Sequence, residues 1–422
     1  MSLPGPILIV SDRPDRKLLT ALAAAGAFPV VESALAGAAG AITRLGPAAV
    51  LLADPDPAPL RLKADELMDA IDALPAPFMP VVARTDDCGA TGLDVLPVSP
   101  GAPIEQIVAR LAAALRVRTL HATVLRRIDT LRHNGADVPL LPDSDPLDDA
   151  TVLVTGRGRS YPALTAAAGR QVSLVGALSV ETAARYLNNR DVDGIIIGEG
   201  FGPPTVDAFL TALGEDSRFR DLPVGIVPDL PASIDRARLA GLEPLGGAPD
   251  EMVARMMPLV RVHAFAARLR RHVASLDARG MIDPQTGLFT VAAFGRDLPR
   301  AIADSHQRNI PMSIARFVLP LDLTRRARID AARLVSRLIR STDFACQDAD
   351  GAITVVFAEA ALRHSHVIAR RIASVMRHTM LDHERADGSR IDAMVTLASL
   401  KSTDTPQSLL ARVTESATVA AE

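Results

Sequence analysis

The sequence has only two cysteines and no long hydrophobic run. Cys88 and Cys346 lie far apart and lack CxxC spacing, which suits a reducing compartment and gives no zinc site. No stretch reaches about 18 apolar residues, so no transmembrane helix is expected. The first residues carry no basic segment ahead of an apolar run, so no signal peptide is expected. These absences predict a cytoplasmic protein.

Lysine is also scarce, since it occurs only at positions 17, 63 and 401, and the positive charge is almost all arginine. The formal net charge of −3 argues against nonspecific nucleic-acid binding. A length of 422 residues predicts about two to four domains of ~100–200 residues each. With 48% hydrophobic and 23% charged residues, each domain can bury a core.

Short apolar runs alternate with Ala- and Leu-rich helical segments in the first part of the chain. This alternation predicts a doubly wound α/β domain with a parallel sheet. A helical pattern then continues without interruption from 104 to 133, and Gly, Pro and Asp at 134–149 indicate a linker. The expected strands are residues 6–10, 48–53, 80–83 and 94–98.

A second α/β pattern begins at Thr151 and ends near Pro249. Its apolar strands are expected at residues 152–154, 194–197 and 223–227. The pattern repeats the first in topology and not in sequence. The chain therefore carries two tandem α/β units before its last third.

A long helix is predicted from about residue 250 to 278. Its apolar residues recur at alternating three- and four-residue steps, which is a heptad seam. The seam fits a helix packed along its own sheet, or a dimerising stalk that spaces two C-terminal domains, and one helix can do both. Its residues are Leu259, Val262, Ala266, Leu269, Val273 and Leu276.

An acidic turn at residues 348–351, followed by an apolar strand at 353–357, predicts a β-hairpin. This layout resembles the signature hairpin of the GGDEF family, the diguanylate cyclases, whose turn carries Gly-Gly-Asp/Glu-Glu-Phe. The same five positions, 349–353, are Ala-Asp-Gly-Ala-Ile here. Residues 340–343, Arg-Ser-Thr-Asp, match the Arg-x-x-Asp motif that the family uses for product inhibition. The catalytic turn is eroded, whereas the nucleotide-binding motif is intact.

Residues 283–288, Asp-Pro-Gln-Thr-Gly-Leu, are similar to the Asp-x-Leu-Thr-Gly-Leu wedge that opens GGDEF domains. Gln285 replaces the leucine, and Phe289-Thr290 replaces the usual Asn-Arg. The two α/β units resemble response-regulator receiver domains, and the order of parts resembles PleD-type and PopA-type regulators. The resemblance implies a receiver-like domain with an extended helix at 1–133, a linker at 134–149, a pseudo-receiver with a stalk helix at 150–280, and a degenerate GGDEF domain at 281–422.

A working receiver needs paired acids for Mg²⁺, an acceptor Asp, a hydroxyl and a lysine. In the first unit Asp12 keeps one acid, Thr85 fits the hydroxyl, and Ser99 stands where the lysine belongs. The aligned acceptor position is Ala53. Asp54 is only a weak candidate phosphoacceptor, because a slip of one residue in a strand reverses the side-chain direction. We expect a receiver fold kept for docking.

The second unit keeps even less of the receiver site. Thr155 and Gly156 stand where the paired acids belong, Gly198 stands at the acceptor position, and the unit has no lysine. Glu199 beside it is either a permanent charge mimic or a solvated loop residue. Phosphorylation by the usual receiver chemistry is not expected there.

Joining two GTP molecules requires Mg²⁺ held by carboxylates and a turn without side chains that lets phosphates approach the backbone. The family takes its metal ligands from the first strand and the signature turn. Here strand 313–318 has no acid and carries Arg316, Gly351 replaces the metal-binding acid, and Ala352 replaces the Glu. Asp350 stands where a glycine belongs, and the family's closing lysine and Gly-Arg-Asn are absent. We expect no catalytic residue, no metal, no cofactor and no enzyme activity.

Arg340 and Asp343 are expected to project from one helical turn, so that both reach one ligand. Arginine binds guanine or phosphate bidentately, and aspartate accepts from guanine N–H groups. The resemblance implies cyclic di-GMP as the ligand and a further arginine after the hairpin, Arg370 or Arg371, with Arg371 preferred on spacing. A leftover surface ion pair is the alternative, since Arg-x-x-Asp recurs at 190–193 and 218–221.

The sequence therefore predicts a non-enzymatic cyclic di-GMP effector that recruits or localises protein partners in bacterial signalling. The resemblance to PopA-type effectors implies a homodimer, a place at the cell pole, and partners of the adaptor or protease-delivery type in cell-cycle regulated proteolysis. A dimeric signalling scaffold without nucleotide binding is the alternative, and a residually active cyclase is a third. No nucleic-acid partner is expected.

Overall fold

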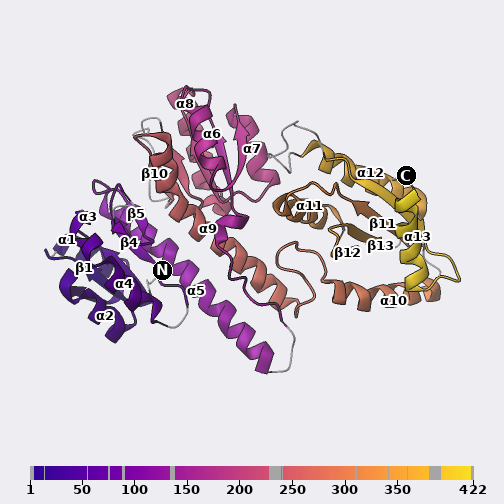
Figure 1. Cartoon of the computed structure of the whole chain (residues 1–422), viewed down its shortest axis with the longest axis horizontal. Helices are drawn as coiled ribbons and strands as arrows, with labels where there is room; N and C mark the ends of the chain where they lie inside the picture. Colours follow the sequence, from indigo (N-terminus) through magenta and orange to yellow (C-terminus); the bar gives the residue numbers. More distant parts are fainter. Residues whose placement is uncertain are drawn as a thin grey trace. The chain divides into compact units, whose positions relative to one another are not determined.

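The chain separates into two compact units (Figure 1). Unit 1 comprises Met1–Arg126 and Pro142–Leu269, and unit 2 comprises Arg127–Leu141 and Arg270–Glu422. Each unit is described by itself below. The structure, a computed structural model, describes residues 4–13, 15–54, 56–74, 77–87, 91–133, 138–227, 239, 241–308, 311–340, 342–358, 360–379 and 391–419.

The first sheet of unit 1 is wholly parallel, with the strand order β2-β1-β3-β4-β5. This is the order of flavodoxin-like doubly wound folds. The inner strands are continuous apolar runs because helices cover both faces of a parallel sheet. The strands are β1 (Pro4–Val10), β2 (Phe28–Ser33), β3 (Ala49–Leu52), β4 (Val81–Arg84) and β5 (Leu96–Val98), and the helices are α1 (Arg16–Ala24), η1 (Leu35–Gly37), α2 (Ala38–Leu45), α3 (Pro57–Leu62), α4 (Ala64–Asp72) and α5 (Ile104–His133).

The second sheet of unit 1 repeats this order as β7-β6-β8-β9-β10, again wholly parallel. A short 3₁₀ helix, η3 (Pro146–Asp149), leads into it. Its strands are β6 (Thr151–Thr155), β7 (Ser173–Ala177), β8 (Gly194–Ile197), β9 (Val224–Ile226) and β10 (Leu242–Pro244), and its helices are α6 (Tyr161–Gly169), α7 (Val180–Asn189), α8 (Pro203–Glu215), η4 (Ser217–Phe219) and α9 (Pro249–Asp277).

The two sheets of unit 1 share one hydrophobic core. Side chains of α1 and α5 against the first sheet, and of α6 and α9 against the second, belong to a single buried cluster. The outer faces have cores of their own, under α2, α3 and α4 on the first sheet and under α7 and α8 on the second. Because burial of apolar surface is the main stabilising term, the shared cluster explains why the two sheets form one compact unit.

A buried ionic cluster joins the two halves of unit 1. Glu243 of β10 is fully buried, and its carboxylate accepts from Arg110 of α5 at 2.6 Å and from Arg255 of α9 at 3.0 Å. Arg255 also donates to the backbone carbonyl of Thr85 at 3.0 Å. A carboxylate removed from water in this way is tolerated only when it is paired and hydrogen-bonded. The cluster therefore fixes the register of the two halves.

The heptad seam of α9 is used within the chain. Leu259, Ala266, Leu269 and Leu276 are at most 5% exposed, and Leu259 belongs to the shared core. A coiled-coil stalk requires such a seam to be exposed to a partner. The structure therefore has these four residues of the seam packed on their own chain, and the dimerising stalk stays a prediction.

Unit 2 contains an antiparallel sheet with the order β12-β13-β11-β14. One face packs against α11 and α12, and the other packs against α10 and α13. The alternation of β13 separates the two faces, since Ile353, Val355 and Phe357 point to the first and Val356 to the second. The elements are α10 (Val291–Arg308), β11 (Ser313–Val318), α11 (Arg325–Leu338), β12 (Phe344–Gln347), β13 (Ile353–Phe357), α12 (Leu362–His378), β14 (Met394–Ser399) and α13 (Pro406–Val419).

The coarse fold prediction is confirmed, because the described residues are mixed α/β with two parallel sheets and one antiparallel sheet. The predicted hairpin is confirmed as β12 and β13. Among the described residues, no helix is both long enough and apolar enough to cross a lipid bilayer.

Candidate functional site

Residues 283–288 form a tight turn that docks beside α11 and β12. The Asp283 carboxylate accepts from the Thr286 hydroxyl at 2.6 Å, and Arg333 of α11 donates to the Gln285 carbonyl at 2.8 Å. Gly287 has a φ of +71°, a conformation that L side chains rarely adopt, so glycine is required there. Phe289 then donates its N–H to Ala345 of β12 at 2.8 Å. This turn therefore anchors the entrance of unit 2 to the hairpin.

Arg340 and Asp343 lie in a turn between α11 and β12 and not in a helix. The helix α11 ends at Leu338, and Ile339 is already extended, with φ −78° and ψ 156°. The Asp343 N–H donates to the Arg340 carbonyl at 3.0 Å. The expectation that both side chains project from one helical turn was therefore wrong, because the aspartate side chain competes with the helix for backbone partners.

The Asp343 carboxylate holds this turn from inside. It is 8% exposed, and it accepts from the N–H of Arg340 at 3.3 Å and from the N–H of Ala358 at 3.1 Å. Burial raises the pKa of Asp343, while these two N–H groups and the Arg340 charge act in the opposite direction. Arg340 itself is exposed. The turn thus presents the arginine outward on a fixed backbone.

The two arginines after the hairpin lie on α12 and are both exposed. Arg371 donates from Nη2 to the Leu338 carbonyl at 3.3 Å, two residues before Arg340. Adjacent residues of a helix point about 100° apart, so Arg370 lies on a different side of α12. Of the four predicted ligand residues, the structure brings Arg340, Asp343 and Arg371 to the same end of α11.

The far end of β12 carries the hairpin turn. The Gly351 N–H donates to the Asp348 carbonyl at 2.9 Å, and Gly351 has a φ of +86°. Gln347 donates from Nε2 to the Gly351 carbonyl at 3.2 Å, and Ala352 donates its N–H to the Asp350 carboxylate at 3.2 Å. The backbone groups that a bare glycine turn would offer to a phosphate are therefore used within the turn.

Arg316 of β11 closes the hairpin turn. Its side chain is 13% exposed, and its guanidinium makes ion pairs with the carboxylates of Asp348 and Asp350, the latter at 2.6 Å. This pairing of Arg316 with the acids of the turn was not expected from the sequence. A guanidinium between two carboxylates forms strong charge-assisted hydrogen bonds. The described residues contain no group of three His, Cys, Asp or Glu side chains able to hold a metal ion.

Cys346 lies next to this ion cluster and is buried. Its thiol donates to the Asp348 carboxylate at 3.7 Å. Burial and the neighbouring carboxylate raise the pKa of Cys346 to about 12. A thiol in this state is neither a nucleophile nor a metal ligand at neutral pH. Cys88 lies outside the described residues.

In unit 1, Asp54 lies beside Ser11 and Asp12, in the corner after the carboxyl ends of β1 and β3. Its carboxylate accepts from the Ser11 hydroxyl at 2.9 Å and from the Asp12 N–H at 2.8 Å. The expectation that a one-residue slip turns Asp54 away was wrong, because β3 ends at Leu52 and strand alternation no longer applies. Ser99 donates to the Asp86 carboxylate at 2.9 Å and is not part of this group.

The other predicted receiver positions are engaged in local contacts. The Thr85 hydroxyl donates to the Asp87 carbonyl at 2.9 Å. In the second half, Glu199 accepts from the Ser160 hydroxyl at 3.1 Å, and its carbonyl accepts from the N–H of Gly158 at 3.0 Å. Glu199 is exposed but holds the loop after β6 in place. It is therefore more than a solvated loop residue.

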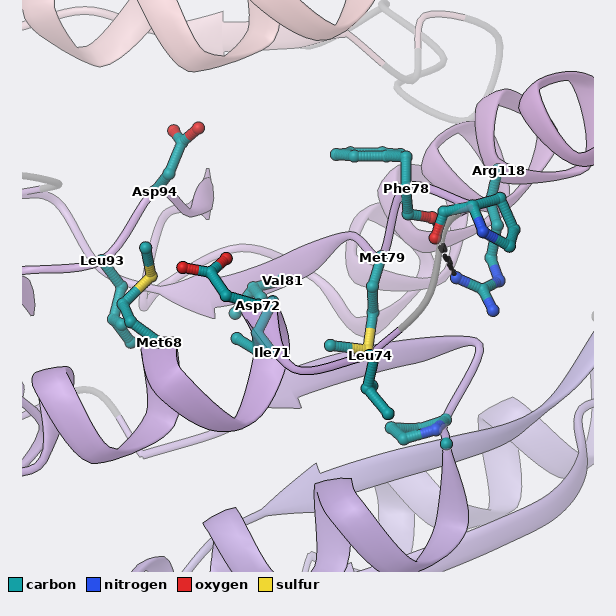
Figure 2. A pocket seen from close by; sticks show the side chains of 13 residues that line it. Met68, Ile71, Asp72, Leu74, Phe78, Met79, Val81, Leu93, Asp94 and Arg118 are labelled. Atoms are coloured by element: carbon teal, nitrogen blue, oxygen red, sulfur yellow. Dashed lines mark hydrogen bonds between the residues drawn. The ribbon is translucent and has the colours of Figure 1, made fainter. Parts of the chain in front are cut away.

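Unit 1 also has a cavity of about 620 Å³ at the other end of its first sheet, beside the amino ends of the strands. Figure 2 shows Met68, Ile71 and Met79 lining it, with Asp72 beside them. Arg118 at its end donates to the carbonyls of residues 77 and 78 at 3.0 and 2.9 Å. Ligands of doubly wound sheets bind outside the carboxyl ends of the strands, whereas this cavity lies before their amino ends. It is separate from the Asp54 corner.

No protein-family model matches the chain, and no curated protein matches it. Among solved structures, it is similar to the coiled coil and GGDEF domain of DgcB from Caulobacter crescentus in complex with c-di-GMP, at 19% identity over 36% of this chain and 87% of that one, with a TM-score of 0.32. It is also similar to the GGDEF domain of FimX from Pseudomonas aeruginosa, at 16% identity over 33% and 93%, with a TM-score of 0.30. TM-scores this low do not establish a common fold.

Proposed function

We propose that unit 2 is a degenerate GGDEF-type domain that binds cyclic di-GMP without making it, and that the whole chain is a PopA-type effector. The observation that carries the proposal is the arrangement at the end of α11. Arg340 is exposed on a turn held by the buried Asp343, and Arg371 reaches the same end of that helix from α12.

The chemistry of these side chains suits a dinucleotide with two guanines and two phosphates. A guanidinium binds guanine O6 and N7, or a phosphate, through two parallel hydrogen bonds. Arg340 and Arg371 supply two such groups. A carboxylate has about four acceptor sites, and Asp343 uses two of them on backbone N–H groups. Because Asp343 is 8% exposed, its main role is to position Arg340.

The absence of cyclase activity is part of the proposal. Arg316 makes ion pairs with the carboxylates of Asp348 and Asp350 at the hairpin turn, so Mg²⁺ would have to displace a guanidinium there. Phosphoryl transfer to a second GTP needs that metal to neutralise developing charge. The turn also lacks open backbone N–H groups for the phosphates at Gly351 and Ala352.

The two sheets of unit 1 are proposed to be receiver-like domains kept for docking. Their parallel 2-1-3-4-5 strand order supports this assignment. The output is proposed to be recruitment or localisation of protein partners, at the cell pole and in cell-cycle regulated proteolysis, with the bound nucleotide favouring one arrangement of the parts. Such a switch requires different affinities for the two arrangements.

Isothermal titration of the full chain with cyclic di-GMP tests the proposal. We expect binding heat for the wild type and none for Arg340→Ala. The matched control is Arg300→Ala, an arginine of α10 with an 81% exposed side chain, which should bind as the wild type does. An Arg340→Ala protein with unchanged affinity would refute the site.

The second candidate is a signalling scaffold that binds no nucleotide, and the engagement of Asp343 by two backbone N–H groups favours it. No heat from the wild type, together with unchanged sedimentation at saturating ligand, would support the scaffold. Product formed from GTP and Mg²⁺ would instead indicate a residually active cyclase.

A further inference from the structure

The outer side of α12 carries an unbalanced positive charge. The helix has arginines at 363, 370, 371 and 377 and histidines at 364, 366 and 378, and residues 362–378 include no Asp or Glu. The whole chain is slightly acidic, with a net charge of −3. The positive charge of α12 is therefore not balanced by any acid within the helix itself.

The exposed basic residues recur with a fixed spacing. Arg363, Arg370 and Arg377 are seven residues apart, which is about 10.5 Å along the helix. Val367 and Ser374 lie between them, so that the five residues follow alternating four- and three-residue steps. All five are exposed, and Val367 is 66% exposed although it is apolar. We call these five residues the outer stripe of α12.

The outer stripe is distinct from the side of α12 that packs and from the side that reaches α11. Ser365, Ala369, Ile372 and Met376 are buried against the sheet. Arg371 donates to the Leu338 carbonyl and faces α11. At the far end of the stripe, Arg377 makes an ion pair with Asp392 at 3.2 Å, with both side chains more than half exposed.

The residues at the start of α12 do not favour helix formation. Unsatisfied N–H groups give a helix N-terminus a partial positive charge, which favours acidic side chains there. The first turn of α12 has no acid and instead carries Arg363 and His364, and its N-cap residue Ala361 makes no side-chain cap. Local choices that oppose folding are expected where a surface serves binding.

We infer that the outer stripe of α12 binds an acidic amphipathic helix of a partner protein. Carboxylates seven residues apart on such a helix match the arginine spacing. An apolar residue between two of these carboxylates would pack on Val367, and the short side chain of Ser374 lets the partner helix approach closely. A nucleic acid would match the charge but would leave the exposed Val367 without a contact. The inference stands without nucleotide binding, since it uses neither Arg340 nor Arg371.

Fluorescence anisotropy measures binding of a labelled 21-residue helical peptide to the full chain. In this peptide the glutamates are seven residues apart, and a leucine lies between successive glutamates, so that the steps are four and three residues. We expect binding that weakens at least tenfold between about 50 and 300 mM salt, because exposed charges are screened. Arg363→Glu should weaken binding at least tenfold, while the acid favours the helix start. Arg300→Glu, on α10, should leave binding unchanged.

Two further probes distinguish binding of a matched acidic helix from binding of any acidic peptide and from binding of a nucleic acid. A peptide of the same composition with its glutamates out of the seven-residue spacing should bind at least tenfold more weakly, and equal binding would overturn the inference. A 20-base-pair duplex that binds as tightly as the matched peptide would overturn it in favour of a nucleic acid. Equal peptide binding by Arg363→Glu and wild type would also overturn it. Titration of Arg363→Glu with cyclic di-GMP reports on the nucleotide site separately.

Discussion

The charged side chains at the two ends of strand β12 differ in whether they are paired with each other. At its end, the carboxylates of Asp348 and Asp350 are neutralised by Arg316, which is 13% exposed. At its start, the carboxylate of Asp343 is used by backbone N–H groups, and the cation of Arg340 remains exposed. The four residues of β12 therefore separate two charged sites. We call the site of Arg316, Asp348 and Asp350 the closed end, and the site of Arg340 and Asp343 the open end.

The difference shows that a count of charged residues does not locate a binding site. The closed end has more ionised groups, but they satisfy one another, so a ligand would have to displace an existing ion pair. At the open end, the Asp343 carboxylate is hydrogen-bonded to the backbone. Arg340 would therefore give up only bound water when it binds a ligand.

The closed end predicts an inert thiol. Because burial raises the pKa of Cys346 to about 12, almost no thiolate is present at pH 8. We expect iodoacetamide to modify Cys346 in the folded protein at least about a hundredfold more slowly than in urea. Mass spectrometry of a Cys88→Ser protein measures this rate without the second cysteine. Rapid modification of the folded protein would mean that the closed end opens readily.

Removing the cation of the closed end should destabilise the fold. Arg316→Ala leaves the neighbouring carboxylates of Asp348 and Asp350 without their shared cation, and we expect the free energy of unfolding to fall by about 2 kcal/mol. Urea unfolding followed by circular dichroism measures it. Arg300→Ala, which removes an exposed ion pair, should change the value by less than about 0.5 kcal/mol. Similar values for the two variants would contradict the closed-site interpretation.

The open end predicts a difference between adjacent arginines. Arg371→Ala should weaken cyclic di-GMP binding about tenfold or more, which is about 1.4 kcal/mol, because Arg371 lies beside the 340–343 turn. Arg370→Ala should bind within about twofold of the wild type. Isothermal titration of both variants gives the comparison. The reverse result would place the ligand on the other side of α12.

The acid of the open end predicts a small dependence of stability on pH. Burial raises the pKa of Asp343 in the folded state, so the folded protein holds the proton more tightly than the unfolded chain. The stabilisation that comes from this tighter proton binding is present in full below the pKa of Asp343 in the unfolded chain. It is lost as pH rises through the pKa of Asp343 in the folded protein. The stability advantage of the wild type over Asp343→Asn, expected to be about 1 kcal/mol, should therefore be greatest in acid and shrink toward neutral pH. Urea unfolding at several pH values measures this trend.

Strongly apolar or long elements could be predicted from the sequence. Strands β8 and β11 and the 30-residue helix α5 begin and end where the apolar pattern places them. The edge strands β2 and β7 were not predicted, because they are less buried than the inner strands and mix polar with apolar residues. At an edge, backbone pairing decides the structure more than side-chain pattern does.

The geometry of the candidate site could not be predicted from the sequence. The Arg-x-x-Asp spacing identified Arg340 and Asp343, but the end of α11 at Leu338 depends on the Asp343 carboxylate turning back to the backbone. The pairing of Arg316 with Asp350 joins residues 34 positions apart. An arginine on a strand beside an acidic hairpin turn is a signal that could have suggested it, since neighbouring strands bring both together.

The buried carboxylate of Glu243 also limits how the gene can be dissected. A fragment that carries β10 without α5 would lose Arg110, one of two cations on a side chain with no access to water. Such a fragment should misfold or be degraded, as would the complementary deletion. A truncation phenotype in either half therefore reports the loss of both halves, and point substitutions at the surface are the sounder tool for assigning tasks to each.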